Sequence, residues 1–430
     1  MINQDDNKKQ ISSDLPETVN NICSNLNPIQ HLENLDYPRL TGSDGEMKAS
    51  KYIFDTLKSN GHEPEIQEFY FKKAKSLMNL LAPAALICWG LLSILNVIIF
   101  DNFILISIII LLLPVGIIFV ILKFDVLMKF IFKNTRKKMS VIKEMIENDR
   151  INKEELTKSR NIIVNIGSKN SKNHLMFTAH YDSISLKLSM KTIKIFSMIG
   201  GGGLILYCLI YLINFITDLI FHINFIISWY FLILIILIIS LVAFSTIFLA
   251  RMFKTNESHG IIDDGTGVAI LLELSKFLQV QVLQDYQITF CFFSGEELGL
   301  YGSGYYFSQK EHDKNKLQVI SIDMIGEKSP ITYIKGINPM KKILMEPNFN
   351  NNIKKIADIL HIKIKDGFFL YPGSDFAHWL LNEYKTNWLI NGSDFIHSKN
   401  DNIQNLNQKL VIDSLKLLVG YLIEFILNKS

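Results

Sequence analysis

Two long stretches of the chain lack lysine and arginine and are rich in apolar residues. They run between Ser76 and Leu122 and between Ile195 and Ala250. Each is long enough for two helices of about 20 residues, the length that crosses the hydrocarbon core of a bilayer. Four such runs, paired as hairpins, favour membrane-spanning helices over the alternative of buried core helices. The predicted spans lie near residues 77–99, 103–123, 195–214 and 226–249.

Positive charges flank both apolar stretches and are absent from the loops inside the predicted hairpins. Lys75 precedes the first stretch, a basic run around Arg136 follows it, and Arg251 follows the second. Because positively charged segments stay on the cytoplasmic side, we expect a multi-pass integral membrane protein with a cytoplasmic catalytic domain. Asn-x-Ser triplets at Asn256 and Asn391 favour the opposite side, but such short triplets often occur by chance.

The polar segments alternate between strand-like and helix-like patterns. Apolar positions at helical spacing predict a helix that begins after Ser43 and ends at Gly61. The same spacing predicts helices over 267–279 and 351–362. Strands are predicted over 65–71, 161–167, 174–180, 287–293, 317–326 and 385–390. This alternation indicates an α/β domain with a largely parallel sheet.

Each predicted hairpin returns the chain to the side of the membrane that it left, so separate polar pieces can assemble into one domain. Seven segments follow from this interpretation. They are a polar N-terminal tail (1–35), a first part of the domain (36–75), hairpin 1 (76–124), an amphipathic connector (125–159), a second part of the domain (160–190), hairpin 2 (191–254) and the remainder of the domain (255–430).

Charge and cysteine content exclude several classes of function. The chain has 44 Lys and Arg residues against 41 Asp and Glu residues, a formal charge of only +3, so nothing favours a nucleic-acid partner. The four cysteines are scattered and form no C-x-x-C pair, which argues against a disulfide framework and against a thiolate zinc site.

Acidic and histidine side chains gather where predicted strands end. The short sequences "TAHYDS", "GIIDDGTG", "GEELG", "SIDMIG" and "SDFIHSKND" each follow or end an apolar run. Ligands bind beyond the carboxyl ends of strands in such sheets, so we expect these side chains to converge. Histidine and carboxylate ligands suit Zn²⁺. A cation also explains the adjacent carboxylates Glu296 and Glu297, because one can bind it while the other stays free as a base.

These motifs, in this order, resemble the zinc exopeptidase family that includes bacterial leucyl aminopeptidases and glutamate carboxypeptidase, metallopeptidase family 28. The resemblance covers about residues 36–75, 160–183 and 257–427. It implies a three-layer α/β domain with a mostly parallel mixed sheet, into which the four spans are inserted. It also implies two zinc ions per chain: His180 and Asp323 would bind one, Glu297 and His397 the other, and Asp263 would bridge both.

The resemblance implies catalytic roles for three further residues. Glu296 would be the general base for a hydroxide that bridges the two ions, and Asp182 would fix the tautomer of a histidine ligand. Tyr371 stands where some members place a tyrosine that stabilises the oxyanion. The sequence departs from the common pattern at Phe376 and Ile396, where many members carry histidine and tyrosine.

The expected function is a membrane-embedded di-zinc exopeptidase, with aminopeptidase as the favoured activity and peptides and the lipid bilayer as partners. A glutaminyl-cyclase-like reaction with one zinc and a non-catalytic membrane scaffold are the alternatives. Asp264 and Asp401 are expected to be hydrogen-bonded supports, and His259 and His378 are candidates for substrate contact. Hairpin 2 lies between Asp182 and the later ligands, so we expect the site close to the bilayer surface.

Overall fold

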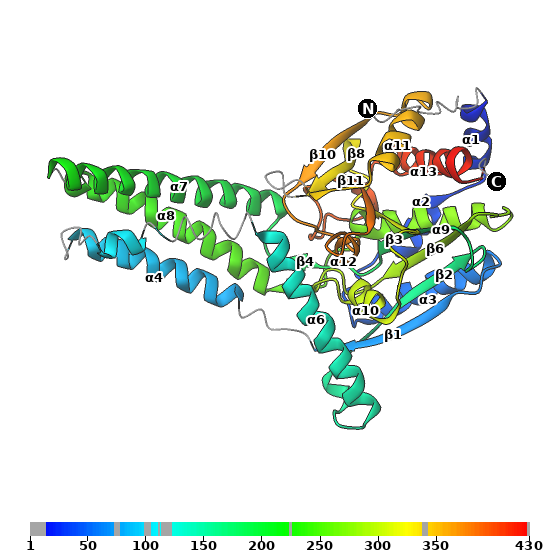
Figure 1. Ribbon diagram of the computed structural model, residues 1–430, viewed down its shortest axis with the longest axis horizontal. Coiled ribbons are helices and arrows are strands. Elements are labelled where there is room, and N and C mark those ends of the chain that lie inside the picture. Colours follow the sequence, from blue (N-terminus) through cyan, green and yellow to red (C-terminus); the bar gives the residue numbers. More distant parts are fainter. Residues whose placement is uncertain are drawn as a thin grey trace, which may run out of the picture.

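The computed structural model combines an α/β domain with long helices that project from it. It describes residues 14–72, 78–98, 105–110, 112, 123–222, 226–337 and 343–427. Three helices, α4 (Met78–Ile98), α7 (Met190–Phe221) and α8 (Ile226–Met252), extend side by side away from the domain (Figure 1). The long axis of the molecule therefore follows these helices.

A mixed sheet forms the centre of the domain. Its described strands are β1 (Glu65–Phe71), β2 (Thr157–Ile166), β3 (Asn173–His180), β6 (Tyr286–Phe293), β7 (Leu317–Asp323), β8 (Lys328–Ile337), β9 (Ile343–Leu344), β10 (Ile364–Phe369) and β11 (Lys385–Gly392). Their order is β1-β2-β6-β3-β7-β11-β8-β10, with β9 paired to β8.

The four central strands of this sheet are parallel to one another, and so are β8 and β10 at one edge, whereas the other pairs are antiparallel. β6, β3, β7 and β11 run in one direction, and the antiparallel pairs are β1 with β2, β2 with β6, β8 with β11 and β8 with β9. The prediction of a largely parallel sheet thus holds for the centre. β8 and β10 had no counterpart among the predicted strands. The carboxyl ends of the four central strands share one edge of the sheet.

Alternating side chains along the central strands build two cores. In β3, Leu175 and Phe177 enter the core on one face, and Met176 enters the core on the other. The first face is covered by α1 (Leu15–Cys23), α2 (Pro28–Leu35), α3 (Asp44–Ser59), α9 (Thr266–Leu278), α11 (Pro347–Ile359) and α13 (Gln408–Leu422). The second is covered by α10 (Tyr301–Gln309) and α12 (Ala377–Leu380).

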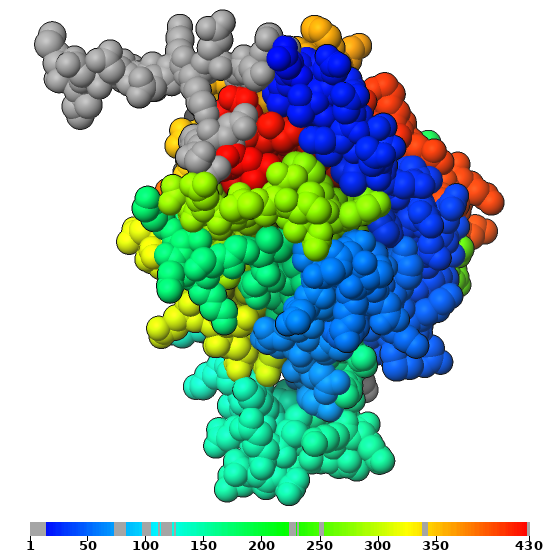
Figure 2. Space-filling view, turned by 90° about the vertical axis from the view of Figure 1, so that its right-hand side faces the viewer, coloured from blue at the N-terminus to red at the C-terminus, as the bar shows by residue number. Residues whose placement is uncertain are grey.

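The N-terminal segment corrects one prediction. Residues 15–35, which the sequence assigns to a polar tail, form α1 and α2. Leu15, Val19 and Leu32 are buried because they line one face of these helices and pack in the first core. Figure 2 shows these blue helices beside the red C-terminal segment, in line with the packing of α1 on α13. The rest of the predicted tail, 1–13, lies outside the described residues.

The connector after the first apolar stretch folds as the amphipathic helix α6 (Phe124–Glu147). It lies against the domain, where Phe132 and Met139 are buried and α6 contacts α10 and β1. Helix α3 also follows its prediction: the Ser43 side chain accepts a hydrogen bond from the Glu46 N–H, and Gly61 adopts a positive φ of 84° just beyond the end.

One helix among the described residues, α7, is long and apolar enough to cross a membrane by length and composition. Only 17% of its most apolar 18-residue window is buried. Shorter apolar helical segments occur at Pro83–Asn96 and Leu232–Phe248. Most of the predicted span near 103–123 lies outside the described residues. The prediction of four spans in two hairpins therefore stays a prediction.

Candidate metal centre

The five side chains predicted to bind metal lie together at the carboxyl edge of the central strands. His180 ends β3 and Asp323 ends β7. Glu297 stands in the loop after β6, and His397 stands in the loop after β11. Asp263 lies in the turn Ile261–Gly265, which leads into α9. These elements are adjacent because β3 pairs with both β6 and β7.

Three of these residues form a buried first triad. His180 Nε2 lies 3.1 Å from Asp263 Oδ1 and 3.7 Å from Asp323 Oδ1. His180 is 1% exposed and Asp323 is 2% exposed. The candidate ligand atoms of the triad all lie within 4.8 Å of one another. Three side chains from the ends of neighbouring elements thus face one point.

The second triad uses the other oxygen of the same aspartate. His397 Nε2 lies 3.2 Å from Asp263 Oδ2 and 3.1 Å from Glu297 Oε2. Its candidate ligand atoms also lie within 4.8 Å of one another. Asp263 therefore offers one oxygen to each triad, which is the arrangement that a bridging carboxylate needs.

The donor set and its unpaired atoms fit divalent cations. Ligand atoms held tetrahedrally at about 2.1 Å from zinc lie roughly 3.4 Å apart, close to the separations above. Among the buried side-chain atoms of the described residues that lack a hydrogen-bond partner are Glu297 Oε1 and Asp323 Oδ1. Buried carboxylates cost free energy unless a partner compensates their charge. A cation in each triad would supply that compensation.

The electrostatics of the cluster also fit bound cations. Burial lowers the pKa of His180, but the carboxylates around it, led by Glu296, raise that pKa well above its ordinary value. For Asp323, burial raises the pKa, and His180 acts in the opposite direction. The site thus holds more acidic groups than its two histidines balance.

Glu296 stands beside the triads without belonging to either. Its Oε2 lies 3.9 Å from His180 Nε2, and its side chain is 13% exposed. Burial and then the neighbouring carboxylates, including Glu297, raise its pKa well above the ordinary value, although His180 acts in the opposite direction. A carboxyl group with a raised pKa is suited to accept and return a proton near neutral pH.

Asp182 lies behind His180, as the resemblance implies, and it also contacts the loop that follows β6. His180 Nδ1 lies 3.1 Å from the main-chain oxygen of Asp182 and 3.6 Å from its carboxylate. The carboxylate also accepts hydrogen bonds from the main-chain N–H groups of Glu296 and Glu297, at 3.2 and 3.3 Å. It also accepts from the Thr41 hydroxyl at 2.8 Å. Asp182 therefore holds the loop that carries both glutamates.

Two further side chains support the turn around Asp263. The Asp401 carboxylate accepts hydrogen bonds from the Ile262 and Asp263 N–H groups at 2.6 and 3.3 Å, as expected for a support. Arg39, which the sequence analysis missed, is fully buried and donates to the carbonyls of Tyr181 and Gly260, both at 2.7 Å. It joins the loop after β3 to the turn before α9. Nothing in its sequence neighbourhood signals this role.

The remaining candidates lie in different surroundings. His378 is buried, and Leu300 and Arg136 are its hydrogen-bond partners, so the prediction of substrate contact does not fit it. His259 Nδ1 lies 2.8 Å from Asp36 Oδ1. Tyr371 is 46% exposed in the loop after β10, and its role in oxyanion stabilisation stays a prediction.

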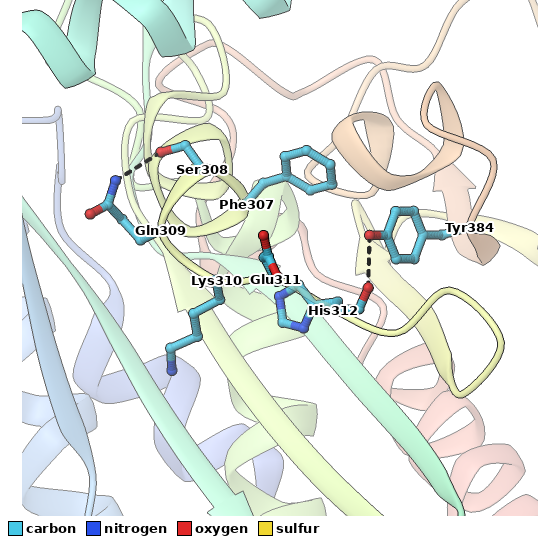
Figure 3. Close-up of a pocket in the computed structure, with 7 residues that line it drawn as sticks. All are labelled: Phe307, Ser308, Gln309, Lys310, Glu311, His312 and Tyr384. Atoms are coloured by element: carbon cyan, nitrogen blue, oxygen red, sulfur yellow. Dashed lines mark hydrogen bonds between the residues drawn. The ribbon is translucent and has the colours of Figure 1, made fainter.

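A cavity of about 620 Å³ lies elsewhere in the domain. Figure 3 shows its lining, which comes from residues 307–312 before β7 and from Tyr384 before β11. The Tyr384 hydroxyl donates to the main-chain oxygen of His312 at 3.1 Å. Because these segments precede the strands, the cavity lies at the amino edge of the sheet, opposite the two triads.

The comparison with known proteins agrees with a metal-binding role for the two triads. The sequence profile described as Peptidase family M28 matches residues 246–422. This segment of the chain is thus similar to the peptidase family M28 domain. Four of the five triad residues lie inside the matched range, and His180 precedes it. The family is one of zinc metallopeptidases, and the residues of both triads have the chemistry of zinc ligands.

A probable leucine aminopeptidase from Trichophyton verrucosum is 25% identical over 190 residues, which cover 40% of this chain and 48% of that protein. The chain thus spans about half the length of this relative.

Two solved structures are similar to this chain in fold. The zinc aminopeptidase BSAP from Bacillus subtilis has a TM-score of 0.51 at 11% identity, covering 95% of each chain. Glutaminyl cyclase from Porphyromonas gingivalis has a TM-score of 0.50 at 15% identity, covering 96% of this chain and 98% of that one. At such low identity the likeness concerns the fold alone.

Proposed function

We propose that this chain is a di-zinc exopeptidase, with aminopeptidase as the favoured activity, and that its apolar helices embed it in a membrane. The observation that carries the proposal is the pair of triads that share Asp263, with Glu296 standing free beside them. The names of the sequence relatives support an aminopeptidase, and α7 supports the membrane assignment.

The roles of the residues follow from their positions. His180 and Asp323 would hold one ion, Glu297 and His397 the second, and Asp263 both. When bound, two zinc ions would polarise the scissile carbonyl and lower the pKa of a water molecule toward neutrality.

Glu296 would take the proton of the attacking water and return it to the leaving amine. Its carboxylate lies 3.9 Å from His180 Nε2, and its side chain is 13% exposed, more than that of His180. Asp182 acts through the main chain: by accepting from the N–H groups of Glu296 and Glu297 it fixes the position of the base relative to the second triad.

The first experiment removes the base while leaving the ligands intact. We expect Glu296→Gln to bind two zinc ions as the wild type does and to lose activity on peptides by about a thousandfold, since general-base catalysis contributes on that order. Glu33→Gln, an exposed change of the same type on α2, should keep full activity. Unchanged turnover in Glu296→Gln would refute the role of this residue.

A second candidate function, cyclisation of N-terminal glutamine with a single zinc ion, is motivated by the cyclase structure that shares the fold. Zinc quantification on the purified full chain distinguishes the two. Two ions per chain and release of free N-terminal residues from a peptide library support the exopeptidase. One ion and pyroglutamate formation support the cyclase.

A further inference from the structure

The two triads differ in how the fold holds them. The first is built on the ends of β3 and β7, in the centre of the sheet, and its side chains are almost fully buried. The second depends on two loops, and the His397 side chain is 23% exposed. Loops need tethering to hold ligands in position, so the contacts of these two loops decide how well the second triad is formed.

The base of the α7–α8 hairpin contacts one of these loops through the main chain. Segments on either side of the hairpin pair as two short antiparallel strands, β4 (Ser185–Leu186) and β5 (Lys254–Thr255). The Leu186 N–H donates to the main-chain oxygen of His397 at 2.9 Å. The strand that leads into the hairpin is therefore hydrogen-bonded directly to a ligand residue.

Two lysines of the same hairpin base contact both loops. Lys254 Nζ donates to the main-chain oxygen of Glu297 at 2.8 Å. Lys194, in the first turns of α7, lies 2.7 Å from Asp394 Oδ1, three residues before His397 along the chain. Lys328 supports the same carboxylate from the domain at 2.5 Å. Both ligands that are unique to the second triad are thus tied to the hairpin.

We propose that the base of the α7–α8 hairpin positions Glu297 and His397 and thereby sets the zinc affinity of the second triad. The inference rests on the proposed function, because it concerns the same metal centre. Lys254 and Lys194 are positioning residues in this account, since they act on the ligands through the main chain and through Asp394. In the described part of the chain, the contacts of His180 and Asp323 are made within the domain, so we expect the two affinities to separate.

This arrangement makes the second triad sensitive to the position of the hairpin relative to the domain. A shift of α7 and α8 relative to the domain would move β4 and β5, and with them the hydrogen bonds to Glu297 and His397. Contacts behind metal ligands typically change metal affinity by about 10- to 100-fold when they are removed.

The test is zinc titration of the metal-free full chain in lipid nanodiscs, followed by calorimetry and by the absorption spectrum of the Co²⁺-loaded form. The double variant Lys194→Ala/Lys254→Ala should bind the first ion as the wild type does and the second about tenfold more weakly. Lys187→Ala/Lys191→Ala is the matched control, because it removes two lysines from the same hairpin base. Of these, Lys187 lies over the Phe253 ring and Lys191 is exposed.

The outcomes distinguish a failure of this inference from a failure of the proposed function. Selective weakening of the second ion, with rescue by Lys194→Arg/Lys254→Arg and with unfolding temperatures equal to the control, supports it. Two ions with unchanged affinities in the double variant, or equal weakening of both ions, overturns it and leaves the exopeptidase proposal standing. A wild type that binds fewer than two zinc ions overturns both.

Discussion

At the scale of single residues, a buried histidine contacts the loop of the proposed base in addition to Asp182. Arg136 can only donate, so His378 Nδ1 accepts from it at 3.1 Å, and the proton of His378 sits on Nε2. Nε2 then donates to the main-chain oxygen of Leu300 at 3.2 Å. The Gly299 and Leu300 N–H groups in turn donate to the main-chain oxygen of Glu296 at 2.8 and 2.9 Å. His378 therefore joins α6 to the turn that carries Glu296.

His378 also makes stability depend on pH. Burial and then Arg136 lower its pKa to about 3. Between about pH 6.5 and pH 3 the unfolded chain binds a proton that the folded chain excludes, so stability falls as pH falls. We expect the wild type to lose about 2 kcal/mol more unfolding free energy than His378→Gln between pH 7 and pH 5, measured by denaturant unfolding at both values.

The paired variant His378→Leu tests the hydrogen bonds themselves. Gln can accept from Arg136 and donate to Leu300, whereas Leu can do neither, so His378→Leu should lose about 1–3 kcal/mol at pH 7 relative to His378→Gln. Equal stability of the two variants at pH 7, or parallel pH curves for wild type and His378→Gln, would contradict this account.

At the scale of elements, the four glycines of α7 show which helix face packs on α8. A Cβ atom on Gly203 would meet Ser240 Oγ at 2.0 Å, and one on Gly200 would meet Phe244 at 3.0 Å. Gly201 and Gly202 have no such neighbour within 4 Å among the residues that the structure describes. The close approach that the glycine run suggested is therefore made at two positions, one helical turn apart, along a single face.

This asymmetry predicts opposite outcomes for neighbouring substitutions. Gly203→Leu should separate α7 from α8 and lower stability by about 1–3 kcal/mol, as overpacking of a tight contact does. Gly202→Leu adds the same atoms where space is open and should leave stability nearly unchanged. Thermal unfolding of both variants in the same detergent measures the difference, and equal midpoints would show that the two helices do not pack as described.

At the scale of the whole molecule, the projecting helices leave the domain on the side where the second triad lies. The chain enters α7 shortly after Asp182 and leaves α8 shortly before Asp263. Apolar side chains such as Leu209, Ile235 and Val242 are more than half exposed along these helices, as lipid-facing residues would be. If the helices span a bilayer, the site opens near its surface.

We expect such a chain to favour substrates that are held at the membrane. In nanodiscs, a peptide with a free N-terminus and a C-terminal lipid anchor should be hydrolysed with an apparent kcat/KM at least about tenfold above that of the same peptide without the anchor, because confinement raises its effective concentration. The anchored peptide should lose this advantage when offered in a second population of vesicles. Equal rates for anchored and free peptide would argue against a site at the bilayer surface.

Much of this molecule follows from local pattern. The apolar runs, the helix from Ser43 and the central strands β3, β6 and β7 were predictable because periodicity and capping act over a few residues. The chemistry of the centre was predictable too, since histidines and carboxylates at strand ends converge wherever parallel strands share an edge. α1 and α2 were missed because their apolar positions are few and become meaningful only against α9 and α13.

The sequence alone therefore determined which side chains are candidate metal ligands and which segments are apolar enough to contact lipid. The tertiary structure decided which loops and main-chain groups the supporting side chains contact. It alone showed that Asp182 holds the loop of Glu296, that Arg39 joins two loops through their carbonyls, and that Lys254 reaches Glu297. These contacts join main-chain atoms to residues distant in sequence. Backbone carbonyls and N–H groups are the same at every position, so no residue pattern records them.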